Sequence, residues 1–390
     1  MMSGRSYRPA LALLGVLAAM AGSALAPAAP PDPDAPVLPP LSPVILAENP
    51  DAVQRFAVNG QMARQMVDAA LLTLTSAPDI GTAWKRLGVT PQDVVGIKIT
   101  TMGGPLLSTH HALVQAICEG LEQAGLSPSR MIIWDKSRDD MIEAGYTPIR
   151  PDDSHVGIVS LFPGVGYDTS VVYKNEIIGT LIWGDTDFIH NSSNADLFDA
   201  ARAAVNDDPT YGPKPDSTNA LTGPAAPPQT STRSYYAVPL TRLCTKIINV
   251  PVLTDNSGIG MEGCLGSLAL GAVDNNRRFQ NDPTYGDPAI CEILDKEFMR
   301  KKVIVHILDS LIAEYAGGPE FNPQFTQQIG AIYVSRDPVA IDSLVLPLLE
   351  KWRKANNVDP IGKAAAHIHD AANYNLGTDD KHRIQLVRVP

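Results

Sequence analysis

Two short apolar segments joined by one helical segment place the strongest constraint on the fold. Val94–Ile99 and Met131–Asp135 each have the length and composition of a buried strand. Between them, His110–Ala124 has the apolar spacing of a helix, and Gly125 ends it. A strand–helix–strand unit of this length favours a parallel pair with a right-handed crossover. The sequence therefore predicts an α/β protein with mostly parallel or mixed sheets and flanking helices.

The same patterns continue along the chain and enlarge the predicted sheet. Further strands are expected at residues 156–161, 170–173, 246–250, 303–307 and 331–334, and further helices at residues 51–74 and 338–354. About 360 residues of the 390-residue chain follow the leader described next, which is more than one core usually holds. We therefore expect two packed lobes.

The N-terminus has the three parts of a signal peptide. Arg5 and Arg8 form a short basic region, and Leu11–Met20 is an apolar run too short to span a bilayer as a helix. Ala24–Ala26 then supplies the small residues at which a signal peptidase cleaves. We predict a signal peptide over residues 1–28, and the alternative is an anchor helix that is retained.

This leader predicts a periplasmic or extracellular protein. Its two arginines are not adjacent, so general secretion is favoured over the twin-arginine route. No later stretch is apolar enough to span a membrane, and the sequence leaves the oligomeric state open. Residues 29–48 are predicted to be a Pro/Ala-rich linker, residues 49–390 the α/β region, and residues 175–235 a loop-rich insertion within it.

Charge and cysteine content argue against several classes of partner and cofactor. The net charge of −11 argues against a face that binds nucleic acid. The four cysteines include no C-x-x-C pair, so neither an iron–sulfur cluster nor a zinc ribbon is expected. Export would permit disulfides, and Cys264 with Cys291 is the first pair to test, whereas Cys118 is expected to be a buried thiol.

Three polar residues stand where the predicted strand–helix–strand unit would bind a ligand. In parallel sheets, ligands bind beyond the carboxyl ends of the strands. Lys98 lies within one apolar strand, Asp135 ends the next, and His110 opens the connecting helix after a Gly-Gly turn. The alternatives are a lysine whose head escapes at the sheet edge and an aspartate that caps a helix.

A second group of polar residues follows the strand predicted near residues 246–253. Asp255 and Asn256 come after this strand, and Asn276 and Arg277 follow a stretch punctuated by glycines. Such a group suits an anionic ligand such as a carboxylate or a phosphate. The motifs G-x-x-x-x-G-K-[ST], G-x-S-x-G and H-E-x-x-H are absent, so the P-loop, esterase and zinc-protease mechanisms are not indicated.

These residues support two hypotheses about function. In the first, an exported enzyme binds a small anionic or metal-bound ligand in a cleft at the strand ends. Asp135 and Asp255 would act as catalytic bases or as ligands to a divalent metal. The ligand would be bound by Lys98, His110, Asn256, Asn276 and Arg277. In the second, the chain is a non-catalytic envelope binding or assembly protein with a degenerate site.

Six segments together carry a resemblance to one known family: Val95–Thr100, Ser108–Gly125, Ile132–Tyr146, Cys244–Leu253, Asn275–Phe279 and Val334–Asp342. The chain is similar to the exported bacterial branch of the family catalogued as domain of unknown function 362. This resemblance implies a two-lobed α/β fold and a distant kinship with nickel-pincer-dependent lactate racemase, but no known reaction. Export argues against a racemase-like nickel enzyme.

The chain departs from the family pattern at several polar positions. Relatives commonly carry Lys and His where Thr254 and Asn256 stand, and a Lys-Asn pair where Gly266 and Ser267 stand. An Asn often occupies the position of Thr100. If these groups build the family's site, this chain has lost two lysines and an imidazole. The resemblance then implies either an altered activity or a non-catalytic relative.

Overall fold

The computed structural model describes residues 41–162, 165–175 and 232–390. The predicted signal peptide, the linker up to residue 40 and residues 176–231 of the predicted insertion lie outside the described residues. The described residues belong to one compact unit, whereas the chain length favoured two packed lobes. The reason is that one sheet runs through this unit and contributes strands to both of its hydrophobic clusters.

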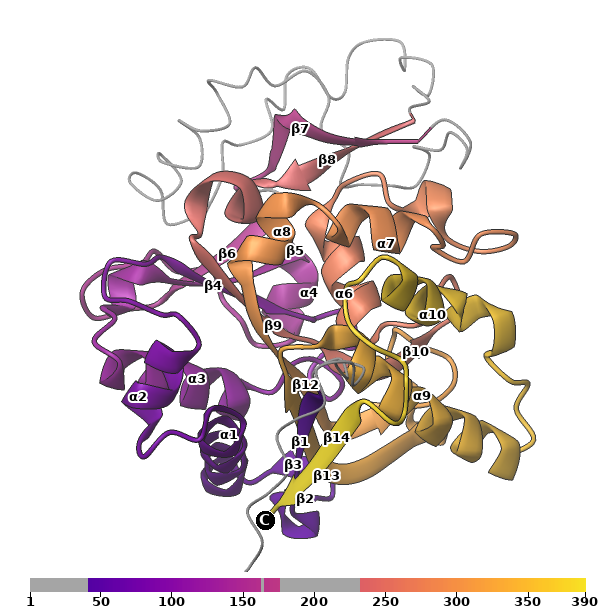
Figure 1. The fold of residues 1–390 in the computed structure, drawn as a ribbon, viewed down its shortest axis with the longest axis horizontal. Coiled ribbons are helices and arrows are strands. Elements are labelled where there is room, and N and C mark those ends of the chain that lie inside the picture. The colour runs from indigo at the N-terminus through magenta and orange to yellow at the C-terminus, as the bar shows by residue number, and fades with distance from the viewer. Residues whose placement is uncertain (1–40, 163–164, 176–231) are drawn as a thin grey trace, which may run out of the picture. The chain divides into compact units, whose positions relative to one another are not determined.

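A ten-stranded sheet forms the centre of this unit (Figure 1). Its main strand order is β14-β1-β13-β12-β9-β4-β5-β6, while β10 pairs with β12 and with β11. These strands are β1 (Ser42–Glu48), β4 (Val95–Ile99), β5 (Met131–Ser137), β6 (Gly157–Phe162), β9 (Lys246–Val250), β10 (Val252–Asn256), β11 (Gly260–Met261), β12 (Val303–Glu314), β13 (Thr326–Ser335) and β14 (Ile384–Val389). Two small sheets pair β2 (Val53–Gln54) with β3 (Ala57–Val58) and β7 (Tyr167–Lys174) with β8 (Arg233–Ala237).

The pairing directions confirm the predicted α/β class. The strands from β6 through β5, β4 and β9 to β12 pair in parallel. The pairs of β13 with β12 and with β1 are antiparallel, so the sheet is mixed. The helix between β4 and β5 is α3 (His111–Gln123), which makes the strand–helix–strand unit predicted from the sequence. Each of the five further predicted strands also overlaps an observed strand.

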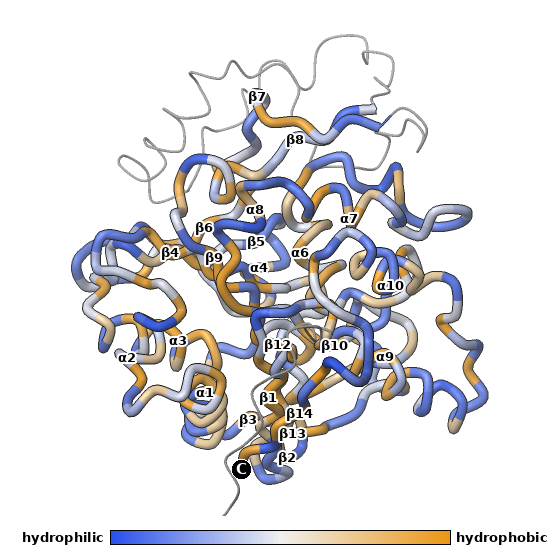
Figure 2. Tube along the Cα trace, in the orientation of Figure 1, coloured by the Kyte–Doolittle hydropathy of each residue, from blue (hydrophilic) through white to orange (hydrophobic). Residues whose placement is uncertain are grey.

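Helices cover both faces of the sheet. One hydrophobic cluster lies beside α1, α2 and α3, and it includes Val95, Ile97 and Ile99 of β4. The other lies beside α6, α7, α9 and α10, on the opposite face of the sheet. Lys98 points to this face, because it alternates with Ile97 and Ile99 along β4. Figure 2 shows the central strands as largely hydrophobic. The helices are α1 (Gly60–Thr75), α2 (Ile80–Arg86), α3, α4 (Arg138–Glu143), α6 (Gly263–Ala272), α7 (Ala289–Leu294), α8 (Glu297–Lys302), α9 (Pro338–Ala355) and α10 (Ala366–Asn373).

Among the described residues, no helix is both long enough and apolar enough to cross a membrane. The helix α6 is the most enclosed of those that bear on the site below, because all ten of its residues are buried. Its length of ten residues makes it a core helix packed between the sheet and α7 and α9. A polar side chain on α6 therefore has to find its partner inside the protein.

The helix predicted from residue 51 begins later than expected. Arg55 and Phe56 have positive φ angles of 50° and 64°, which form a tight turn between β2 and β3 and interrupt any helix there. The helix α1 starts at Gly60, where the side chain of Asn59 accepts hydrogen bonds from the backbone N–H groups of Gln61 and Met62.

The linker predicted for residues 29–48 ends earlier than expected. Residues 42–48 form β1, which pairs in parallel with β14 and antiparallel with β13. The run from Val44 to Ala47 is fully buried, so its apolar character outweighs the proline content of the preceding residues. Pro43 is tolerated near the start of the strand, and its carbonyl accepts a hydrogen bond from Ser335.

Cys264 and Cys291, the first pair to test for a disulfide, are not joined. All four cysteines are buried free thiols, which confirms the prediction for Cys118. The Cys291 thiol instead points to the backbone of α10 and donates a hydrogen bond to the carbonyl of His367 at 3.5 Å. Burial raises the pKa of the Cys118 and Cys244 thiols to about 12, so both stay protonated.

Candidate functional site

The ammonium group of Lys98 is buried between the sheet and α6. The side chain is 3% exposed, and its Nζ lies 3.2 Å from Oδ1 of Asp135. The same Nζ donates a hydrogen bond of 3.3 Å to Oγ of Ser267 on α6. The pairing of Lys98 with Asp135 explains why a charge is tolerated inside an apolar strand.

Gly271 makes room for this lysine on α6. A Cβ added to Gly271 would lie 2.4 Å from Cε of Lys98 and 3.0 Å from its Nζ. Any larger residue at this position would displace the lysine from its place against the helix. The absence of a side chain at Gly271 is therefore part of how the fold positions the ammonium group.

Three hydroxyl groups surround the Lys98–Asp135 pair. Thr101 donates a hydrogen bond of 2.7 Å from Oγ1 to Oδ2 of Asp135. Thr100 and Ser267 share a hydrogen bond of 2.7 Å between their hydroxyl oxygens. Both threonines follow β4 directly, so the carboxyl end of this strand supplies them. All three hydroxyl side chains are buried.

A second carboxyl group, that of Glu262, lies near the pair. Glu262 immediately precedes α6, and its Oε1 accepts a hydrogen bond of 2.9 Å from Nδ2 of Asn256. Burial raises the pKa of Glu262; the nearby Lys98 opposes this effect and Asp135 adds to it. The raised pKa favours the neutral acid form of Glu262 next to the ion pair. We refer to Lys98, Asp135, Glu262, Asn256 and Ser267, with Thr100 and Thr101, as the strand-end site.

Asn276 lies just after α6, the helix that supplies Ser267 to the strand-end site. Its Nδ2 donates a hydrogen bond of 2.8 Å to the carbonyl of Leu270, near the end of α6. Its Oδ1 accepts one of 3.0 Å from Gln280, whose side chain lies against Gly258. Asn276 therefore holds the turn after α6, and its side chain bonds to Leu270 and Gln280 rather than to Lys98.

Three predicted site residues lie elsewhere. Asp255 and Lys98 both stand toward the carboxyl ends of parallel strands. However, Asp255 and Asn256 are neighbours on β10 and point to opposite sides. Oδ2 of Asp255 lies 3.2 Å from Nη1 of Arg353, and its Oδ1 accepts a hydrogen bond from the backbone N–H of Gly318.

His110 and Arg277 are also separate from the strand-end site. His110 belongs to the α3 face, where its Nδ1 and its backbone N–H each lie 2.8 Å from Oδ2 of Asp309. Burial lowers the pKa of His110, but the Asp309 carboxylate outweighs this effect and raises it above the ordinary value. Arg277 is exposed in a single turn of 3-10 helix after α6, where its side chain faces solvent.

Sequence reasoning missed Glu262 and Ser267. Both lie in or beside the glycine-punctuated stretch, for which no helix was predicted, whereas residues 263–272 form the buried helix α6. The sequence held one signal for them: a single acidic residue, Glu262, stands directly before an apolar run of the length of a short buried helix.

Among the described residues, no group of three or more His, Cys, Asp or Glu side chains is arranged to hold a metal ion.

Asp255 belongs to a second buried acidic cluster, which leads to a prediction about pH. Glu314 is fully buried near Asp255, and burial raises its pKa to about 7. A raised pKa in the folded state adds stability below about pH 4.5, and this contribution is lost as the pH rises through 7. We expect Glu314→Gln to stabilise the protein at pH 8 by about 3 kcal/mol, with no difference near pH 4.

This pH effect is measured by urea unfolding at several pH values. The matched control is Glu297→Gln, which changes an exposed glutamate of α8 paired with Lys301. The control should show no comparable gain at pH 8. A constant difference between Glu314→Gln and the unchanged protein across this pH range would contradict the assignment of a raised pKa to Glu314.

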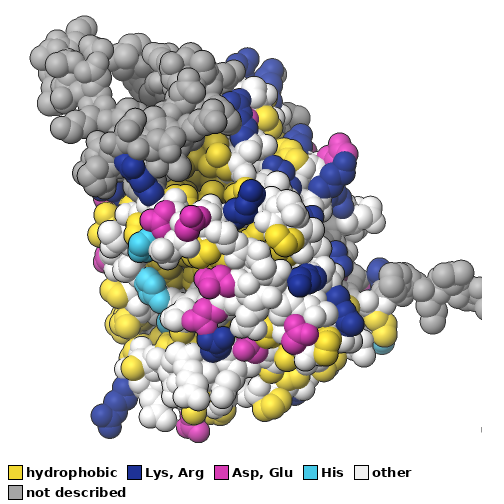
Figure 3. Space-filling model, turned by 90° about the vertical axis from the view of Figure 1, so that its left-hand side faces the viewer, with side chains coloured by type: hydrophobic (Ala, Val, Ile, Leu, Met, Phe, Trp, Pro, Cys, Tyr) yellow, Lys and Arg dark blue, Asp and Glu magenta, His cyan; other side chains and the backbone are white. Residues whose placement is uncertain are grey.

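The surface around the first three helices carries charges of both signs. Figure 3 shows the face on the left-hand side of Figure 1, where acidic and basic side chains are interspersed. The visible face therefore offers no continuous basic patch among the described residues, of the kind that neutralises phosphates.

Comparisons with known proteins add little to this geometry. No family model matches the chain, and no curated protein matches it. Among solved structures, the chain is similar to a Thermotoga maritima protein from the Northeast Structural Genomics Consortium, with 7% sequence identity and a TM-score of 0.36. The match covers 78% of this chain and 61% of the Thermotoga chain, so this chain spans less than two thirds of that protein.

Proposed function

We propose that this chain is an exported member of the family catalogued as domain of unknown function 362 and binds a small organic anion at the strand-end site. The observation that carries the proposal is the buried Lys98–Asp135 pair at the carboxyl ends of β4 and β5. This is the edge of a parallel sheet at which α/β proteins bind ligands. The predicted leader supports the location in the periplasm or outside the cell.

Hydrogen-bond donors outnumber charged acceptors at this site. Lys98 supplies an ammonium group, and Thr100, Thr101 and Ser267 supply hydroxyl groups. Glu262 adds a donor in its neutral acid form, which burial favours by raising its pKa. A set of donors around one cation suits a carboxylate or another small oxyanion.

The two carboxyl groups suit acid–base chemistry on such an anion. Asp135 can accept a proton as a carboxylate, and Glu262 can donate one because its pKa is raised. Two neighbouring carboxyl groups with different environments are a recurrent arrangement for a base and an acid. We therefore assign the roles of base to Asp135, acid to Glu262 and anion binding to Lys98.

A second candidate function is a non-catalytic binding or assembly protein of the cell envelope. It is favoured by the fact that Lys98 is 3% exposed and already paired with Asp135 and Ser267. In that case the pair would only stabilise the fold. The two functions differ in whether an anion can compete with Asp135 for the lysine.

Anion binding to the Asp135→Asn variant separates the two functions. An anion bound to Lys98 has to displace the Asp135 carboxylate, so removing that negative charge should tighten binding about tenfold, which corresponds to about 1.4 kcal/mol. The probes are acetate, oxalate and inorganic phosphate, measured by calorimetry at low ionic strength. Ser267→Ala should weaken the same binding, because it removes a donor beside the ammonium group.

The matched control for this experiment is Asp168→Asn. Asp168 is also buried and pairs with Arg242 at 2.6 Å, but it lies on β7, apart from the contacts of the strand-end site. Its substitution should leave the affinity for all three probes unchanged. Equal affinities of the Asp135→Asn variant and the unchanged protein, or no saturable binding to either, would exclude the anion site and leave the non-catalytic function.

A further inference from the structure

Two more polar side chains continue the row that begins with Lys98. Lys98 on β4 is paired in register with Asn249 on β9, and Asn249 with His306 on β12. These are neighbouring positions on neighbouring strands, so all three side chains point to the face that carries α6. Lys98 lies at one side of that helix, and His306 lies at the other, two strands away.

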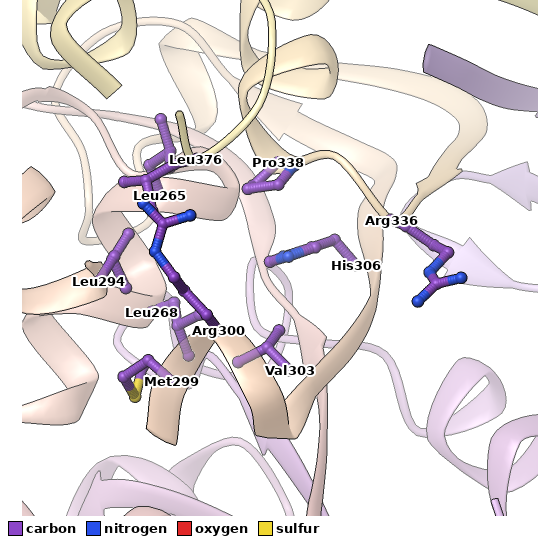
Figure 4. Close-up of a pocket in the computed structure, with 10 residues that line it drawn as sticks. All are labelled: Leu265, Leu268, Leu294, Met299, Arg300, Val303, His306, Arg336, Pro338 and Leu376. Atoms are coloured by element: carbon purple, nitrogen blue, oxygen red, sulfur yellow. The ribbon is translucent and has the colours of Figure 1, made fainter. Parts of the chain in front are cut away.

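His306 forms part of the wall of a pocket (Figure 4). The pocket has a volume of about 150 Å³. An apolar cavity of about this size in another protein holds one benzene molecule. Figure 4 shows the imidazole extending into the space between the surrounding side chains. The apolar part of the lining comes from Leu265, Leu268, Leu294, Met299, Val303 and Leu376.

The hydrogen bonds of Asn249 define which imidazole nitrogen carries the proton. Nδ2 of Asn249 donates a hydrogen bond of 3.0 Å to the carbonyl of Cys264, and this orients the amide group. The same Nδ2 lies 3.1 Å from Nδ1 of His306 and directs its second hydrogen there. Nδ1 is therefore the acceptor, and the proton is on Nε2.

The imidazole remains neutral at physiological pH. Burial lowers the pKa of His306 to about 3. The residue is 4% exposed, and no acceptor for its Nε2 is found among the described residues. The Nε2–H group faces the pocket space and is not fully enclosed by protein, so a ligand that supplies an acceptor there gains a hydrogen bond of up to about 1.5 kcal/mol.

The arginines near the pocket do not add a charged binding group to its interior. The guanidinium of Arg300 is already held by Asp295 and by the carbonyls of Tyr374 and Asn375. Figure 4 shows the exposed side chain of Arg336 pointing away from His306. The interior is thus an apolar space with one neutral donor, which favours an uncharged ligand over an anion.

We infer that this pocket, called the His306 pocket, binds a small uncharged molecule with an apolar body and one carbonyl group. The carbonyl oxygen accepts the Nε2 proton of His306, and the body packs against Leu265, Leu268 and Val303. Small ketones, esters and amides of about the size of a substituted benzene belong to this class. This site is separate from the strand-end site and does not depend on the function proposed for it.

Three probes of similar size test the inference on the full chain. Acetophenone has a carbonyl and no charge, ethylbenzene lacks the carbonyl, and benzoate is an anion. We expect calorimetry to show acetophenone binding at least tenfold more tightly than either ethylbenzene or benzoate. We also expect acetophenone to shift the Nε2 resonance of His306 in nitrogen-15 NMR spectra, since that nitrogen donates the hydrogen bond.

Two variants separate the donor from the shape of the pocket. His306→Phe keeps a planar ring but removes the donor, so acetophenone and ethylbenzene should then bind equally. Val303→Phe narrows the pocket at a partly exposed position and should abolish acetophenone binding without removing His306. Binding of ethylbenzene as tight as that of acetophenone to the unchanged protein would overturn the inference. The absence of binding by all three probes would also overturn it and indicate a pocket filled only by water.

Discussion

Replacing Lys98 with methionine is expected to lower the free energy of unfolding by about 4 kcal/mol. Methionine keeps most of the length of the side chain, so the change removes the charge rather than the packing. Asp135 and Glu262 would then be buried without the ammonium group that lies 3.2 Å from Asp135. An uncompensated charge in the interior is much less favourable than a buried pair.

A double-mutant cycle assigns this loss to the ion pair. Urea unfolding of the Lys98→Met/Asp135→Asn variant should show a smaller loss than the sum of the two single substitutions, because neither charge remains. The matched control is Lys363→Met, which breaks an exposed pair with Asp282 of 2.7 Å and should leave stability almost unchanged. Additive single effects would contradict a direct interaction between Lys98 and Asp135.

The half of the strand-end site that comes from β4 and β5 was predictable from sequence. Lys98 and Asp135 occur at the carboxyl ends of two strands whose parallel pairing follows from the single helix between them. The other half comes from a segment more than a hundred residues later in the chain. Nothing in the local pattern around Ser267 indicates that α6 would cross the sheet beside Lys98.

The main error in predicting the site came from grouping residues that are close together in the sequence. Asp255 and Asn256 were grouped because they follow the same apolar run. Alternation along β10 separates them, so that Asn256 meets Glu262 and Asp255 meets Arg353. His110 was grouped with Lys98 because it follows the same strand, but it starts a helix on the opposite face of the sheet.

The outer strands of the sheet depend on pairing between the two ends of the described chain. β1 and β14 pair in parallel although they are separated by more than three hundred residues. β1 has clear apolar character, but the prolines before it indicate a linker when they are considered alone. β14 is half-exposed along its length, so the apolar pattern in its sequence predicts a strand only weakly.

The helix α6 contributes residues to both the strand-end site and the His306 pocket. Ser267 of α6 contacts Lys98, while Leu265 and Leu268 line the pocket. The N-terminus of this buried helix has no capping side chain of its own. Asp342 of α9 takes that role from outside, because its carboxylate accepts hydrogen bonds of 2.7 Å and 2.9 Å from the N–H groups of Cys264 and Leu265.

Replacing Asp342 with alanine is therefore expected to destabilise the fold by about 3–5 kcal/mol. The change leaves two N–H groups buried without acceptors. Burial raises the pKa of Asp342 to about 7, so at pH 8 the change also removes a charge that complements the helix dipole. Asp342→Asn keeps one oxygen acceptor and should lose less. The measurement is the free energy of unfolding in urea, followed by the affinity of each folded variant for acetate and acetophenone.

The control for this prediction is an ordinary helix cap on the surface. Asp79 caps α2 by accepting a hydrogen bond of 2.8 Å from the N–H of Thr82, and it is exposed. Asp79→Ala should cause a much smaller loss, because water can replace the lost acceptor. If Asp342→Ala were no more destabilising than Asp79→Ala, Asp342 would not be the acceptor that holds α6 in place. If Asp342→Asn were as destabilising as Asp342→Ala, the negative charge of Asp342 rather than its shape or a single oxygen acceptor would explain the effect.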